Sequence, residues 1–157
     1  MAASPDSDAD ALRAIPFFEG LSADHLKRIA ASAESRSLPE KLLLYDEGQL
    51  LHSAYVIMSG SMRAERKGRD AGPPVTRDIA AGVVLGDRAL ILDTRATESV
   101  RVASRARVLQ IRRVTFRRLL QDHPAIAVAL RARLSRTVVQ AAQEFSAAAQ
   151  RIAAIDR

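Results

Sequence analysis

The sequence predicts a mainly β domain with flanking helices. From Ser37 to Ile111, short apolar or alternating runs are separated by turn residues at intervals of about eight to twelve residues, a pattern typical of a β-sandwich or barrel. The segments on either side carry apolar residues at helical spacing instead. With 157 residues and no cysteine, the chain is expected to form one domain whose core needs no disulfide or zinc–thiolate site.

Two segments precede the predicted strands. Residues 1–12 are expected to form a disordered acidic tail, because they are mostly small or acidic and offer little to bury. A helix is expected to begin after Ser22, since Ser is a good N-cap and Leu26, Ile29 and Ala30 follow at helical spacing. This helix is expected to end near Ala33.

The central part of the chain divides into short strands. The stretch 67–74 is charged and contains Gly and Pro, so we expect it to be the tip of a hairpin. Strands are expected on both sides of this tip, at residues 42–45, 54–58, 61–66, 75–79, 83–84, 99–103 and 106–111.

The last third of the chain is expected to be helical. One helix is predicted at 115–123, with a break at Pro124, and a long helix over 125–157, because residues 125–156 contain no Gly or Pro. Apolar residues in the long helix recur at alternating steps of four and three, the pattern of a two-helix seam. We expect this seam to form a homodimer, the alternative being a helix packed on its own domain. The seam residues are Leu134, Val138, Ala141, Phe145, Ala148, Ile152 and Ile155.

The charge is unevenly distributed. The net charge is +6, and residues 101–157 carry 12 Arg against three acidic residues. Such a basic segment permits weak contact with nucleic-acid phosphates. No aromatic or Gly-rich recognition element lies among the arginines, however, so we expect a solvated helix surface. No apolar run is long enough to span a bilayer and the N-terminal residues do not resemble a secretory signal, so the cytoplasm is the expected location.

Residue patterns for catalysis or metal binding do not stand out. There is no Ser-His-Asp arrangement, Walker loop or paired-carboxylate motif, so an enzyme is not expected. His25, His52 and His123 lie far apart in different predicted elements, whereas a metal site needs converging ligands. No metal or other cofactor is therefore expected.

The segment 82–97 is the most informative for function. It is predicted to be a strand that ends at Gly86, then an acidic residue, a short helical turn and Arg95. Backbone N–H groups at the start of a short helix attract anions, a guanidinium pairs with phosphate through two hydrogen bonds, and the Asp87 carboxylate can accept from a ribose hydroxyl. We name residues 85–97 the cassette. Its chemistry predicts a small phosphorylated sugar as ligand.

These features together resemble the cyclic nucleotide-binding domain family, which includes the sensor domain of the catabolite activator protein and the regulatory domains of protein kinase A. The resemblance covers roughly residues 13–135. Its order and spacing are specific, and it is carried by residues 15–21, 44–48, 54–62, 82–87 and 116–124. It implies a double-stranded β-helix (jelly-roll) domain over 13–124, with a long C-terminal helix that closes over a bound nucleotide.

The family places a Gly-Glu pair on the ribose and an Arg nine or ten residues later on the phosphate. Gly86-Asp87 matches the pair, although Asp is shorter than Glu by one C–C bond, about 1.5 Å. Counting from Asp87 and counting back from Val100 both bring Ala96 to the position of the Arg, and Arg95 lies one residue early. Either a local slip brings Arg95 into that role, or the phosphate anchor has been lost.

Two further departures concern charge and the purine. Glu98 stands where the family has a small residue, close to the place of an anionic ligand, and Arg88 is a candidate to compensate or else a surface Arg. The family's contacts to the purine fall near Ala141 and Ala142, with Gln143 next. The candidate ligand-binding residues are Leu85, Gly86, Asp87, Arg88, Ala89, Arg95, Ala96, Thr97 and Gln143.

The resemblance therefore implies a regulatory or sensor module that binds cAMP or cGMP and signals through its C-terminal helix to a protein partner. The alternative is a degenerate sensor that acts as a ligand-independent dimerisation or docking domain. Because no helix-turn-helix follows the long helix, sequence-specific DNA binding is not expected.

Overall fold

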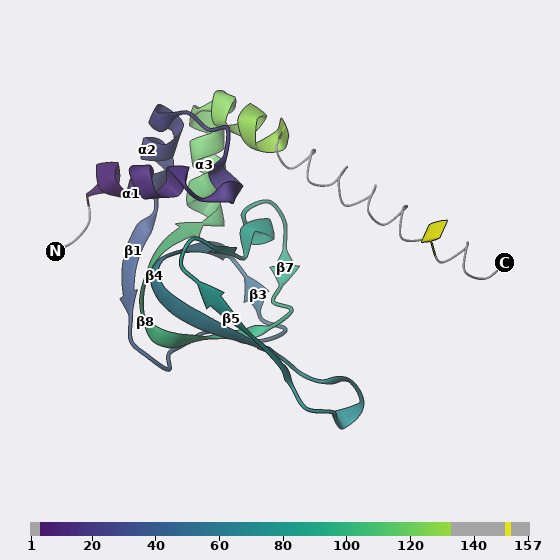
Figure 1. The fold of residues 1–157 in the computed structure, drawn as a ribbon. Coiled ribbons are helices and arrows are strands. Elements are labelled where there is room, and N and C mark those ends of the chain that lie inside the picture. The colour runs from purple at the N-terminus through teal and green to yellow at the C-terminus, as the bar shows by residue number, and fades with distance from the viewer. Residues whose placement is uncertain (1–3, 133–149, 152–157) are drawn as a thin grey trace.

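The computed structural model describes residues 4–132 and 150–151, and within them an antiparallel β-roll carries a cluster of helices at one end (Figure 1). The predicted class, mainly β with flanking helices, is confirmed. The helical end is built from α1 (Pro5–Arg13), the 3-10 turn η1 (Pro16–Phe18), α2 (Ala23–Ser32) and α3 (Arg113–Asp122). The hairpin between β4 and β5 extends from the other end of the roll (Figure 1).

Two long strands form the backbone of the roll. β4 (Ser53–Arg66) and β8 (Ser99–Arg112) pair antiparallel from Ser53↔Arg112 to Glu65↔Ser99, and the main sheet runs in the order β1-β8-β4-β5. β2 and β6 pair at its margins, and β3 with β7 forms a separate two-stranded sheet. The remaining bounds are β1 (Glu34–Leu38), β2 (Leu43–Tyr45), β3 (Leu50–Leu51), β5 (Val75–Ala80), β6 (Val84–Leu85) and β7 (Thr94–Arg95).

Two strands predicted separately are joined into one in the structure, and the cause is local. The runs predicted at 54–58 and 61–66 form one strand, bent where the β4–β8 register shifts between Ile57 and Met62. Gly60 lies in this bend with φ +83°, and a Cβ there would collide with the backbone at Arg105 and Ala106. A glycine therefore lets the two long strands cross closely and curl, where the sequence pattern suggested a turn between two strands.

The apolar residues form two cores on the two faces of these strands. Ala54 and Val56 of β4 pack with the helices, together with Phe18, Leu26 and Ile29. Ile57 and Met62 belong to the interior of the roll. The interior also contains Leu38, Tyr45, Leu51, Ala64, Ile79, Leu85, Ala89, Ala96, Val100, Val102, Ala106 and Val108.

The prediction of a disordered tail over residues 1–12 is wrong for residues 5–12, which belong to α1. The Ser4 hydroxyl accepts a hydrogen bond from the Ser7 N–H at 3.2 Å, and Pro5 opens the helix, both typical start signals. Leu12 is fully buried against the other helices. Asp8 is also buried, and its carboxylate pairs with Arg107 of β8 at 2.8 Å. The low average hydrophobicity of the segment concealed these few buried contacts.

The helices after β8 follow the prediction where they are described. α3 begins two residues before the predicted 115, His123 leaves helical geometry, and residues 124–132 are helical again. Ile126 and Leu130 join the helix-side core. The seam residues Leu134, Val138, Ala141, Phe145, Ala148, Ile152 and Ile155, like Gln143, lie outside the described residues.

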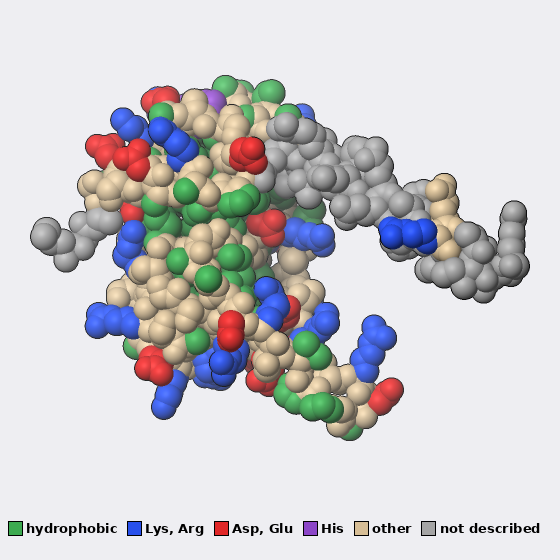
Figure 2. All heavy atoms as spheres, in the orientation of Figure 1, with side chains coloured by type: hydrophobic (Ala, Val, Ile, Leu, Met, Phe, Trp, Pro, Cys, Tyr) green, Lys and Arg blue, Asp and Glu red, His purple; other side chains and the backbone are tan. Residues whose placement is uncertain are grey.

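Surface charge of both signs is spread over the molecule. On the face shown in Figure 2, Lys and Arg side chains are interspersed with Asp and Glu over both the roll and the helices. No helix among the described residues combines the length and the apolar character needed to cross a bilayer.

The buried ion pair of α1 leads to a stability prediction. Replacing Asp8 with Ala leaves the Arg107 guanidinium, which is 28% exposed, without its charged partner. We expect the free energy of unfolding to fall by about 2–4 kcal/mol in urea titrations, the range for breaking a largely buried pair. Asp10→Ala is the matched control, since Asp10 is an exposed acid on the same helix. Equal effects of the two substitutions would contradict the role of the pair in docking α1.

Candidate functional site

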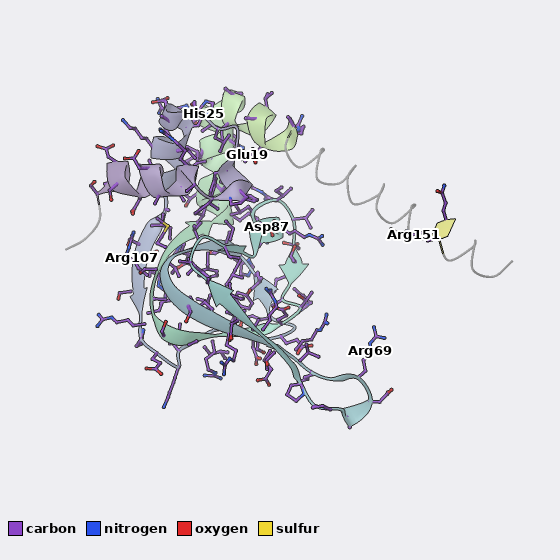
Figure 3. The ribbon with its side chains drawn as sticks, in the orientation of Figure 1. Glu19, His25, Arg69, Asp87, Arg107 and Arg151 are labelled. Atoms are coloured by element: carbon purple, nitrogen blue, oxygen red, sulfur yellow. The ribbon has the colours of Figure 1, made fainter. Side chains whose placement is uncertain are left out.

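The cassette begins at a glycine that the backbone requires. Gly86 adopts left-handed geometry at φ +74° and precedes the four-residue turn η3 (Asp87–Leu90). A Cβ at this position would lie 3.0 Å from the Ser53 carbonyl oxygen of β4. β6 holds the turn against that strand through the pairing of Leu85 with Tyr55. Residue 86 therefore brings the cassette close to β4, at the end of the roll nearest the helices, where Figure 3 shows Asp87.

The side chains of η3 point in different directions. Ala89 and Leu90 are buried, Arg88 is exposed, and Asp87 is half-buried. The Ala89 N–H donates to the Gly86 carbonyl oxygen at 3.0 Å. This amide is therefore not free to bind a phosphate, because the turn itself uses it.

The register of β7 decides between the two readings of Arg95. β7 pairs with β3 so that Arg95 lies opposite Leu50 and Thr94 opposite the buried Leu51. Arg95 is exposed and donates from Nη1 to the Gly48 carbonyl oxygen at 3.0 Å. Ala96 is buried in the roll, and the local slip that would bring Arg95 inward does not occur.

Hydrogen bonds on both sides of residue 96 fix this register. The Ala96 N–H donates to the Gln49 carbonyl oxygen at 2.8 Å, and the Gly48 N–H donates to the Ala96 carbonyl oxygen at 2.7 Å. A shift by one residue would break both bonds and bury the Arg95 side chain. The interior position therefore carries a methyl group, as counting along the sequence indicated.

One cation lies on the interior side of the sheet, although its side chain is largely exposed and it comes from another strand. Arg77 of β5 lies opposite the buried Ala64 and two residues before the buried Ile79, so it shares their face. Its Nε and Nη2 donate to the two carboxylate oxygens of Glu98 at 3.1 and 2.9 Å. Arg77 is not among the site residues predicted from the sequence. The alternation of residues 75–79 could have indicated the face of the strand from which the Arg77 side chain projects, but it gave no sign that Glu98 is its partner.

Tyr45 of β2 reports the electrostatics of the same region. Burial, with the nearby carboxylates of Glu98 and Asp87 and the Tyr55 phenol as further causes, raises the pKa of Tyr45 to about 12, whereas Arg77 acts to lower it. The rings of Tyr45 and Tyr55 lie 6.2 Å apart. Asp87, Arg77 and Glu98 therefore influence one phenol, although they come from three separate segments.

The two remaining cassette candidates differ in burial. Leu85 belongs to the interior core and Thr97 is exposed.

His52 is exposed and the His123 ring lies 3.1 Å from an Arg28 guanidinium nitrogen. Among the described residues, no three His, Asp or Glu side chains are grouped as metal ligands would be.

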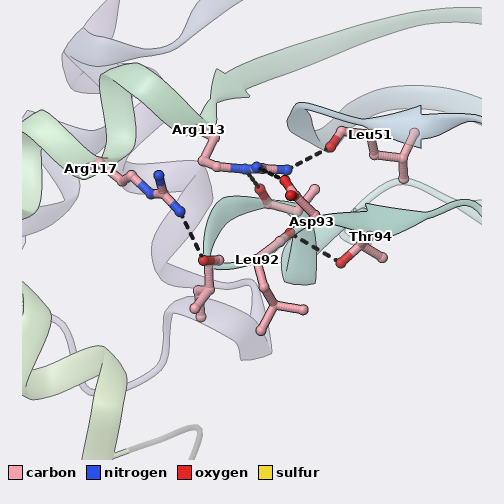
Figure 4. Close-up of polar contacts among 8 residues, drawn as sticks. Leu51, Leu92, Asp93, Thr94, Arg113 and Arg117 are labelled. Carbon is pink, nitrogen blue, oxygen red and sulfur yellow. Dashed lines mark hydrogen bonds and ion pairs between the residues drawn. The ribbon is translucent and has the colours of Figure 1, made fainter.

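Arg113 connects the cassette to α3 (Figure 4). It is the first residue of α3, and its guanidinium donates to the carbonyl oxygens of Leu51 and Ala89 and to the Asp93 carboxylate. The hydrogen bond and charge of Arg113 hold the pKa of Asp93 below its usual value. One side chain thus joins β3, η3 and the loop before β7 to the helix that follows β8.

A second arginine of α3 supports the same contact. Arg117, one turn further along α3, donates to the Ile91 carbonyl oxygen at 3.3 Å, and the Thr94 hydroxyl closes the loop by donating to the Leu92 carbonyl oxygen at 3.2 Å (Figure 4). Sequence reasoning missed these contacts, because an Arg at the start of a helix gives no sign of partners 20 to 62 residues away.

Comparison with known proteins agrees with the geometry. Residues 35–123 match the family model described as the cyclic nucleotide-binding domain. A cyclic nucleotide-binding-like protein from Brucella abortus is 30% identical, with a TM-score of 0.64, and the match covers 73% of this chain and 97% of that one. The N-terminal domain of a transcriptional regulator from Streptomyces coelicolor is 20% identical and superposes with a TM-score of 0.81 over 87% of this chain and 95% of that domain.

Two further similarities extend the range of relatives. The regulatory domain of Toxoplasma gondii PKA with cAMP is 19% identical and has a TM-score of 0.70 over 87% of this chain and 50% of that chain. An uncharacterized NTE family protein of Mycobacterium tuberculosis is 26% identical over 132 residues, 83% of this chain. The matched region is 22% of that protein, so the chain spans about a fifth of the curated relatives it matches.

The two tyrosines give a direct test of the interior. Burial raises the pKa of Tyr55 as well as that of Tyr45, and they are the chain's only tyrosines. In absorbance titrations at 295 nm, we expect little phenolate signal near pH 10, the usual tyrosine value. The stability from the protonated phenols is complete below pH 10 and is lost as pH rises through the folded value near 12 for Tyr45. Full ionisation of either tyrosine in the folded protein near pH 10 would contradict the described interior.

The Arg113 contacts lead to a second prediction. Arg113→Ala leaves the Leu51 and Ala89 carbonyls without their donor, and we expect a loss of about 1–3 kcal/mol in the free energy of unfolding, with faster amide exchange in residues 89–93. Arg117→Ala, which removes one long exposed hydrogen bond, should cost less than about 1 kcal/mol.

Carboxyl NMR adds a pH test of the same contacts. The pKa of Asp93 should rise toward the usual Asp value in Arg113→Ala. Because the Asp93 pKa is lower in the folded than in the unfolded chain, the ionised carboxylate stabilises the wild type at any pH above the unfolded-state pKa. This contribution disappears as pH falls through the folded-state pKa. The stability gap between wild type and variant should therefore narrow in acid. An unchanged Asp93 titration would contradict the link.

Proposed function

The chain belongs to the cyclic nucleotide-binding domain family, and from this we propose that it is a regulatory module that binds cAMP or cGMP within the roll and signals through its C-terminal helix. The observation that carries the proposal is that Asp87, Arg77 and Glu98 all act electrostatically on the Tyr45 phenol, beside a cassette that keeps its left-handed glycine and the pairing of β7 with β3. We place this module in the cytoplasm, as its sequence predicts.

The ribose is assigned to Asp87. Its carboxylate is half-buried at the start of η3 and makes no ion pair or side-chain hydrogen bond with any other described residue. A carboxylate in this state can accept hydrogen bonds from a hydroxyl of a bound sugar, and such charge-assisted bonds are stronger than neutral ones. The methyl groups of Ala89 and Ala96 are the neighbouring surfaces of the cassette that face inward.

The signal is proposed to pass from the cassette into α3. A ligand that draws η3 toward the interior would pull on Ala89 and Asp93, both of which Arg113 holds, and so would bias the position of α3. The helical segment 124–132 follows α3 directly and is packed through Ile126 and Leu130. Ligand binding then acts as a population shift between positions of the C-terminal helix. A homodimer through the seam residues 134–155 would convert that shift into a change of dimer geometry.

A second candidate function has its own support. Ala96 replaces the phosphate-binding Arg, and the carboxylate of Glu98 already occupies Arg77. Both features are expected of a degenerate domain that docks a protein partner or dimerises without ligand. The two candidates differ in whether the roll takes up a nucleotide at all.

Calorimetric titration with cAMP and cGMP separates the two candidates. We expect binding by the wild type at concentrations up to about 1 mM, and a weakening of about tenfold or more in Asp87→Ala, which loses the acceptor for the sugar. Arg95→Ala should leave the affinity within about twofold, because Arg95 points outward.

The control for Asp87 is Asp70→Ala, an exposed acid in the tip of the β4–β5 hairpin. It changes the net charge equally and should leave binding unchanged. Absence of heat with either nucleotide would favour the ligand-independent domain. A loss of affinity in Arg95→Ala as large as that in Asp87→Ala would contradict the register of β7 as the basis of the site.

A further inference from the structure

The ion pair between Arg77 and Glu98 has an unusual place in the roll. It joins β5 to the segment between β7 and β8, and both residues alternate with buried ones, Arg77 with Ile79, and Glu98 with Ala96 and Val100. The Glu98 side chain is only 21% exposed, whereas that of Arg77 is 56% exposed. The pair therefore lies at the edge of the interior rather than on the outer surface.

The outer face of the same hairpin carries a comparable pair. Arg63 of β4 and Asp78 of β5 lie opposite each other and form a 3.1 Å contact in which both side chains are more than half exposed. Asp78 directly follows Arg77, so its side chain leaves the opposite face of the strand. The two pairs share chemistry and neighbourhood but differ in the face that they occupy.

The charges around the interior site favour a cation over an anion. Among the charged groups that act on the Tyr45 phenol, Arg77 is positive, whereas Glu98 and Asp87 are negative. A cyclic nucleotide brings one further negative charge, which Asp87 and Glu98 both repel. The phosphate can be accommodated only where it meets Arg77 and where Glu98 no longer occupies the guanidinium.

A guanidinium offers the same two-pronged donor geometry to carboxylate and to phosphate. Arg77 already uses this geometry, because Nε and Nη2 each donate to one oxygen of Glu98. We propose that Arg77 is the phosphate-binding cation of this site, and that Glu98 is a built-in competitor that a bound phosphate must displace. The inference rests on the proposed nucleotide-binding function and names two residues that set its affinity.

The structure makes the direction of each effect clear. Glu98→Gln keeps the size of the side chain but removes its charge, so it frees Arg77 and removes one repulsion. We expect cAMP or cGMP to bind about tenfold tighter or more in calorimetric titration of the full chain. Arg77→Gln removes the cation and should weaken binding about tenfold or abolish it, both alone and combined with Glu98→Gln.

The outer pair supplies matched controls. Asp78→Asn and Arg63→Gln remove the same charges from the opposite face of the hairpin, and we expect nucleotide affinities within about twofold of wild type. Thermal melting of each variant verifies the fold before titration. If Asp78→Asn tightens binding as much as Glu98→Gln, the effect comes from net charge and the proposal is overturned.

A phosphate titration separates this inference from the proposed function. Inorganic phosphate should raise the melting midpoint of Glu98→Gln more than that of wild type, and Arg77→Gln should remove the difference. If the wild type binds nucleotide and the Arg77 and Glu98 variants bind it equally well, the inference fails and the proposed function stands. If no variant binds nucleotide but phosphate stabilises Glu98→Gln through Arg77, the inference stands and the proposed function fails. If neither ligand acts, both fail.

Discussion

The long antiparallel pairing of β4 with β8 is the constraint on which the rest of the structure depends. Because both strands are 14 residues long and bend together near Gly60, one stretch of their surface faces the helices while another lines the interior. β1, β2, β5 and β6 all pair with one of these two strands. The cassette depends on the same pairing, since β6 rests on β4 and Gly86 approaches Ser53 closely.

The same pairing explains how a site in the roll is joined to the helices. β8 ends at Arg112, and the next residue, Arg113, begins α3 and holds three points around the cassette. Because no linker separates β8 from α3, the first turn of the helix is tied both to the strand and to the cassette. Movement of the cassette relative to β8 must therefore either break the Arg113 hydrogen bonds or carry the start of α3 along.

The sequence predicted what depends on local pattern and missed what depends on distant partners. Alternation identified most strands, Ser22 marked the start of α2, and counting from Asp87 correctly placed Ala96 at the interior position. Helix α1 was missed because its burial rests on Leu12 and on the pairing of Asp8 with Arg107, 99 residues away. Arg77 and Arg113 were missed for the same reason, since their partners are known only once the roll has closed.

The position of the positive charge distinguishes a phosphate site whose cation is held by a competing carboxylate from a site that has lost its cation. In the family the phosphate-binding Arg belongs to the cassette, whereas here the cassette contributes Ala96 and the guanidinium at the edge of the interior comes from β5. Because the Arg77 side chain is 56% exposed, its pair with Glu98 contributes only roughly 0–1 kcal/mol to folding. The charge at residue 98 therefore has little influence on the stability of the roll. Its influence on an entering phosphate is much larger, because the carboxylate and the phosphate compete for the same two guanidinium donors.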